Sequence, residues 1–196
     1  MFTRMVGALV RAIMIVVVIL TPSLLIPGTS SESAKMITLV ALAFAMVAVF
    51  EYGAKFPGLI EFRDAPPFNR LRVIALFLTL FGLSVISRSG YDGSTLTVVV
   101  TALGFLVGQA LDFPYSPLRL VVDQLPQGID TTVAAQIQAM AGLSMLITLL
   151  SLFLFSALVR LEHWPNRGTA FNVWINLPTF DPTAGGDVVK RLNRDG

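Results

Sequence analysis

The chain alternates long apolar runs with short polar segments, and this alternation is its clearest structural signal. A hydrocarbon core ~30 Å thick is crossed by roughly 20 apolar residues in an α-helix, so runs close to this length predict membrane spans. The pattern therefore predicts an all-α protein, a polytopic transmembrane helical bundle with about five spans. The predicted spans cover residues 6–26, 34–52, 71–87, 94–111 and 133–160.

The last part of the chain, residues 161–196, has no apolar run of spanning length. Tryptophan and phenylalanine residues occur there among prolines, asparagines and glycines. Aromatic residues in such a setting favour the membrane–water interface. We therefore expect a transmembrane domain over residues 1–160, followed by an interfacial C-terminal tail.

Composition agrees with a membrane protein and narrows the chemistry. Hydrophobic residues make up 55% of the chain and the mean hydropathy is +0.76, whereas soluble domains have roughly 45–50% apolar residues. The chain has no cysteine and a single histidine, His163. These counts exclude disulfides, thiolate metal sites and a bis-histidine haem within one copy of the chain. The net charge is only +2, so we expect no nucleic-acid partner, and we also expect no cofactor and no metal.

The basic residues set the expected orientation through the positive-inside rule. With five spans and a cytoplasmic N-terminus, seven Lys and Arg residues fall on each side of the membrane. Three of those outside, Lys190, Arg191 and Arg194, lie further past the last span than the roughly 15–20 residues over which the rule acts. Without them the division is seven to four. We therefore expect the N-terminus in the cytoplasm and the tail on the opposite side.

Charge is concentrated in two stretches after the second and fourth predicted spans, residues 60–72 and 112–132. On the expected topology, both stretches lie on the cytoplasmic face. Their mixed charges fit a polar docking surface, or a headgroup site in which arginines pair with phosphate. They also fit a simpler interpretation, in which the charges set the topology and pair with one another. The candidate binding residues are Glu61, Arg63, Asp64, Arg70, Arg72, Asp112 and Arg119.

Small residues predict two helix-packing faces. Gly104 and Gly108 form a GxxxG pattern, which lets helix backbones approach closely. This pattern serves either packing within the bundle or a homo-oligomer through Gly104 and Gly108. Ser144, Thr148 and Ser151 follow helical spacing on the last predicted span and form a small, polar stripe that we expect to pack against another helix.

Motifs for enzymatic chemistry are missing from the sequence. We find no nucleotide-binding loop, no GxSxG nucleophile motif and no HExxH metal motif. Every ionisable residue lies within about two turns of a predicted span end, which argues against a proton- or ion-coupled transporter. We expect a non-enzymatic accessory or scaffold subunit that docks onto a larger membrane-protein complex in the lipid bilayer. The alternative is a carrier or binder of lipid or of another hydrophobic small molecule.

Three stretches of the chain resemble segments of a known group of proteins. They read EFRDAPPFNR (61–70), DFPYSPLRL (112–120) and FNVWINLPTFDPTAGGDVV (171–189). They are similar to small, polytopic inner-membrane proteins of alphaproteobacteria, a group with no assigned activity. The resemblance implies a location in the bacterial inner membrane, and it implies nothing about activity.

Overall fold

Within the described residues, the regular secondary structure is all α-helical. The computed structural model describes residues 2–55, 58–60 and 66–161. The predicted interfacial tail over residues 161–196 lies almost wholly outside this part. The six helices are α1 (Phe2–Leu25), α2 (Ser31–Gly53), α3 (Pro66–Ser87), α4 (Thr95–Ala110), α5 (Pro117–Asp123) and α6 (Thr131–Leu161). The prediction of an all-α helical bundle is therefore confirmed.

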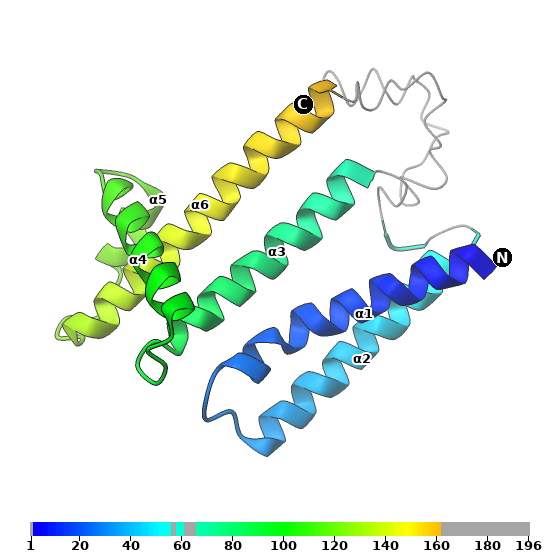
Figure 1. Ribbon diagram of the computed structural model, residues 1–196, viewed down its shortest axis with the longest axis horizontal. Coiled ribbons are helices and arrows are strands. Elements are labelled where there is room, and N and C mark those ends of the chain that lie inside the picture. Colours follow the sequence, from blue (N-terminus) through cyan, green and yellow to red (C-terminus); the bar gives the residue numbers. More distant parts are fainter. Residues whose placement is uncertain (1, 56–57, 61–65, 162–196) are drawn as a thin grey trace.

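Four helices run side by side along one direction, and α4 lies across α6 (Figure 1). The start of α1, the end of α2, the start of α3 and the end of α6 share one end of the bundle. There the Arg11 guanidinium lies 4.6 Å from the centroid of the Tyr52 ring, and the rings of Phe68 and Phe155 are 5.9 Å apart. We call this end the Tyr52 end, and the opposite end the Ser87 end.

The four helices that run side by side are long enough to cross a membrane. They are α1, α2, α3 and α6, each with at least 18 residues and an apolar stretch of spanning length. The chain thus has the helices of an integral membrane protein. The fourth predicted span, residues 94–111, forms α4, whose 16 residues extend about 24 Å at ~1.5 Å per residue. This length falls short of a ~30 Å hydrocarbon core.

Helix α3 begins at Pro66, five residues before the predicted start at residue 71. Pro66 and Pro67 lie in the first turn of α3, although proline inside a helix breaks it. The first turn of a helix leaves its N–H groups unpaired, so proline is tolerated there and its fixed φ favours helix entry. The earlier start places Phe68, Asn69 and Arg70 on a helix instead of in a loop.

Alanines hold α1 and α2 together. Ala8, Ala12, Ala41, Ala45 and Ala48 are all buried. Such small side chains let two helix backbones approach closely, which is the main source of helix association where lipid removes the hydrophobic driving force. At the Ser87 end, the Gln136 side chain donates a 2.7 Å hydrogen bond to the Ile86 carbonyl and ties α6 to the last turn of α3.

Candidate functional site

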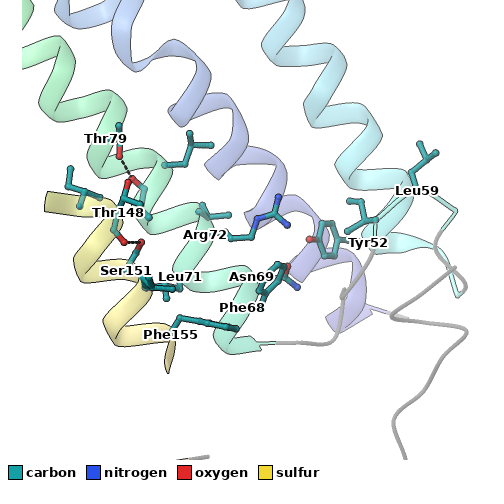
Figure 2. A pocket seen from close by; sticks show the side chains of 16 residues that line it. Tyr52, Leu59, Phe68, Asn69, Leu71, Arg72, Thr79, Thr148, Ser151 and Phe155 are labelled. Carbon is teal, nitrogen blue, oxygen red and sulfur yellow. Dashed lines mark hydrogen bonds between the residues drawn. The ribbon is translucent and has the colours of Figure 1, made fainter. Parts of the chain in front are cut away.

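A cavity of about 1100 Å³ opens at the Tyr52 end between α2, α3 and α6 (Figure 2). Pockets for drug-sized ligands measure roughly 300–1,000 Å³, so this one has room for a larger molecule. We call it the α3–α6 groove. It is lined by Tyr52, Leu59, Ile60, Phe68, Asn69, Leu71, Arg72, Val73, Ala75, Leu76, Thr79, Ile147, Thr148, Ser151, Leu152 and Phe155.

Away from its mouth, the groove has walls that are apolar in effect. Its hydroxyl groups donate to carbonyls of their own helices: Thr79 to Ala75 at 2.8 Å, and Ser151 to Thr148 at 2.8 Å. Because these hydroxyls are already paired, they do not require a polar ligand. From Phe68 to Thr79 the groove follows α3 for about 16 Å at ~1.5 Å per residue. This distance is about half of a ~30 Å hydrocarbon core, or one leaflet.

Polar groups gather at the mouth of the groove. The Arg72 guanidinium lies 5.0 Å from the centroid of the Phe68 ring. At this distance the aromatic ring attracts the cation through a cation–π interaction. Figure 2 shows the Arg72 side chain and the Tyr52 hydroxyl pointing toward one another from α3 and α2, with Asn69 beside them. The mouth therefore combines a permanent cation with neutral hydrogen-bonding groups.

Glu51 holds the short segment of residues 58–60, which forms the edge of the groove beyond the end of α2. One carboxylate oxygen, Oε2, accepts hydrogen bonds from the backbone N–H groups of Gly58, Leu59 and Ile60 at 2.9, 2.9 and 3.2 Å. Charge-assisted hydrogen bonds of this kind are about twice as strong as neutral ones. Glu51 thereby holds Leu59 and Ile60 against the groove.

The predicted binding residues are divided between two places. Arg70 and Arg72 lie on the first turns of α3 at the Tyr52 end, and both are exposed. Asp112 and Arg119 lie near α5, beside the half of α6 that begins at Thr131 (Figure 1). Glu61, Arg63 and Asp64 lie outside the described residues. The structure does not bring the described residues of the two stretches together, because α4 crosses α6 instead of returning to the Tyr52 end.

Asp112 and Arg119 pair with each other. The Arg119 Nη1 atom lies 3.2 Å from Asp112 Oδ1, and its Nε atom lies 3.2 Å from Asp123 Oδ1. The hydrogen bond to Asp112 and the charges of both carboxylates raise the pKa of Arg119 above its ordinary value. Exposed pairs of this kind add little stability. Their geometry fixes the turn between α4 and α5, and it leaves Arg119 less available to a partner.

The predicted packing residues also have different roles. Gly104 and Gly108 are buried against α6, where a Cβ on Gly108 would lie 2.8 Å from the Gln138 carbonyl oxygen. A homo-oligomer through this pair would require α4 to leave α6. Ser144 is half-buried on α6, whereas Thr148 and Ser151 line the groove.

Several important residues were not singled out from the sequence. Gly142 packs directly on the backbone of Gly104 and Gly108, and a glycine inside a long helical run is a signal for such close approach. Tyr52 on α2 and Phe155 on α6 become groove residues only through the tertiary arrangement, in which α1 packs against α2 and α3, and α3 packs against α6. No local pattern marks them.

The turn between α3 and α4 is held by Asp92. Its carboxylate accepts hydrogen bonds from the Ser94 N–H at 3.0 Å, from the Ser94 hydroxyl at 3.0 Å and from the Thr97 hydroxyl at 3.1 Å. The hydrogen bonds from Ser94 lower the pKa of Asp92 below its ordinary value of 3.8. A carboxyl group with a lowered folded-state pKa contributes stability above its unfolded-state pKa, and this contribution is lost as the pH falls through the folded-state value.

We therefore expect Asp92→Asn to lower the thermal unfolding midpoint at pH 7, with a difference from the wild type that shrinks once the pH falls below about 3.8. The measurement is circular dichroism in detergent at several pH values. A difference that stays constant down to pH ~2.5 would show that the Asp92 carboxylate does not stabilise this turn.

Comparison with protein-family models, with curated proteins and with solved structures finds no match. Within the described residues, no group of three or more His, Asp or Glu side chains is arranged to hold a metal ion. The α3–α6 groove is therefore the candidate functional site of the described chain.

Proposed function

We propose that this integral membrane protein binds one lipid molecule in the α3–α6 groove. The observation that carries the proposal is the groove itself, which holds about 1100 Å³. It is apolar over the depth of one leaflet and has the Arg72 guanidinium at its mouth. Pockets that pair apolar walls with a few polar groups select amphiphilic ligands. An arginine at the level of the interface adds an attraction for anionic headgroups.

We further propose four spans, with α4 entering the membrane only from the Ser87 end. With five spans, the Lys and Arg residues divide between the two sides of the membrane as described above. This distribution changes with four spans, because the start of α1 and the end of α6 then both lie at the Tyr52 end. Among the described residues, six basic side chains then lie at the Tyr52 end and three at the Ser87 end. The six are Arg4, Arg11, Lys55, Arg70, Arg72 and Arg160, and the three are Lys35, Arg88 and Arg119.

The positive-inside rule then supports a cytoplasmic Tyr52 end. The N-terminus stays in the cytoplasm, as the sequence predicts, and the end of α6 joins it there. The resemblance to inner-membrane proteins supports the bacterial inner membrane as the location. The lipid would then come from the cytoplasmic leaflet.

The role of an accessory subunit remains the other expectation, and no described contact favours it over lipid binding. Three of its candidate docking residues, Glu61, Arg63 and Asp64, lie outside the described residues. Purification in mild detergent separates the two hypotheses. A protein partner in constant stoichiometry would favour the subunit, whereas bound lipid in constant stoichiometry favours the groove.

A substitution that fills the groove tests lipid binding. We expect Ala75→Phe to weaken lipid binding roughly tenfold, equivalent to ~1.4 kcal/mol, because the ring would occupy the space beside Leu76 and Thr79. The measurement is native mass spectrometry of the detergent-purified protein titrated with phospholipid.

Ile74→Phe is the matched control for this test. Ile74 is 50% exposed and does not line the groove, so a ring there faces the lipid surroundings and leaves the groove open. Equal lipid binding by Ala75→Phe, Ile74→Phe and the wild type would reject the groove as the binding site.

A further inference from the structure

We infer, on the basis of the proposed function, that the lipid is a glycerophospholipid whose phosphate is bound by Arg72 at the cytoplasmic mouth of the groove. The acyl chains would then lie along α3 and α6. Three features of the groove and its surroundings support this class of ligand.

The first feature is the charge balance at the Tyr52 end. Glu51 is the one carboxylate among the described residues at this end, against six basic side chains. Its Oε2 atom already accepts three backbone hydrogen bonds. The Ser87 end has the opposite balance, with three basic side chains and five carboxylates, which are Glu32, Asp92, Asp112, Asp123 and Asp130. The excess positive charge of the described residues at the Tyr52 end therefore favours an anion there.

The second feature is the state of Arg72. Within the described part of the chain, the ion pairs involve Arg88 and Arg119 and not Arg72. The Arg72 guanidinium instead lies over the Phe68 ring at 5.0 Å. The planar guanidinium carries paired N–H donors that match two oxygens of a phosphate.

The third feature is that the groove has Arg72 at its mouth, where a headgroup would lie, and extends far enough to hold acyl chains. Arg72 lies near the start of α3, and the groove continues from there to Thr79. A phosphate at Arg72 would therefore sit at the interface, with its acyl chains reaching toward the middle of the membrane. The Tyr52 hydroxyl faces the same place (Figure 2) and can donate a further hydrogen bond to a phosphate oxygen.

Three ligands with related acyl chains test the inference. Native mass spectrometry of the full-length protein in detergent would measure binding of dioleoylphosphatidylglycerol, of dioleoylglycerol, which lacks the phosphate, and of oleate, which carries a carboxylate. We expect the phospholipid to bind roughly tenfold more tightly than either of the others, since a charged hydrogen-bonded pair contributes about this much.

Substitution of Arg72 assigns the phosphate to this side chain. We expect Arg72→Gln to weaken phosphatidylglycerol binding roughly tenfold and to leave dioleoylglycerol binding unchanged. Arg72→Lys should recover part of the loss, because it keeps the charge without the planar pair of donors. Lys35→Gln, which removes one charge at the Ser87 end, is the control and should bind as the wild type does. An unchanged thermal midpoint for Arg72→Gln would show that the fold is intact.

The outcomes separate this inference from the proposed function. Equal binding of phosphatidylglycerol and dioleoylglycerol, with both blocked by Ala75→Phe, would keep the groove and overturn the phosphate. Tighter binding of oleate would replace the phosphate by a carboxylate. An equal loss for both glycerolipids in Arg72→Gln would show that Arg72 shapes the groove and does not bind phosphate. No binding of any of the three ligands would overturn the proposed function as well.

Discussion

Gly142→Val is expected to destabilise the bundle by about 3 kcal/mol or more, at the upper end of the range for overpacked cores. A Cβ at position 142 would fall on the Gly104 carbonyl oxygen and the Gly108 nitrogen, and would lie 2.7 Å from the Gly108 Cα. All three atoms belong to the backbone of α4, so no side-chain rotation can make room. Either the two helices separate or α4 changes its path.

The measurement is reversible unfolding of the purified protein in mixed detergent micelles, followed by circular dichroism. Gly93→Ala is the control, because nothing lies within 4 Å of a Cβ built at that position. We expect Gly93→Ala to change stability by no more than about 0.5 kcal/mol, as for most surface substitutions. A Gly142→Val protein as stable as Gly93→Ala would mean that α4 does not cross α6 at these glycines.

The second large effect is a difference in the labelling of single introduced cysteines: those on one side of the membrane should react in intact cells, and those on the other side should not. The chain has no cysteine, so single introduced cysteines report their own side. In intact bacterial cells, a membrane-impermeant maleimide is expected to label Gly90→Cys and Gln127→Cys, and to label Leu161→Cys only after permeabilisation. Gly90, Gln127 and Leu161 are all exposed, so access within the protein does not limit the reaction.

The five-span topology predicts a different result. If α4 crossed the membrane, Gln127 would lie on the opposite side from Gly90, and Leu161 would be labelled in intact cells. Labelling of Leu161→Cys without permeabilisation, together with protection of Gln127→Cys, would therefore restore the fifth span. It would also place the end of α6 away from the N-terminus.

The long helices could be predicted because each apolar run is close to the thickness of a bilayer. Local composition was enough for α1, α2 and α6. For α4, residues 94–111 have the composition of a span, but composition alone does not give the length and path of the helix. The path of α4 depends on contacts of Gly104 and Gly108 with Gly142, which lies more than thirty residues further along the chain.

The site could be predicted only in part for the same reason. Arg72 was among the candidate residues because charge is rare in this chain. The groove beside it is formed by Tyr52, Phe68 and Phe155, which come from three helices. In the sequence these aromatics are indistinguishable from lipid-facing ones. The pairing of Asp112 with Arg119 likewise shows that a cluster of charges can serve the fold alone.

The position of Tyr52 has a consequence for cohesion of the bundle. Helix α2 packs against α1, and its Tyr52 side chain faces α3 and α6 across the groove (Figure 2). A lipid in that space would contact both α2 and the α3–α6 pair. Removing the lipid would therefore weaken the packing between these helices as well as empty the groove. By thermodynamic linkage, a lipid present at 100 times its Kd adds about 2.7 kcal/mol of stability. Extraction with harsh detergent, which removes bound lipid, should then disrupt the tertiary packing of the bundle before the helices unfold.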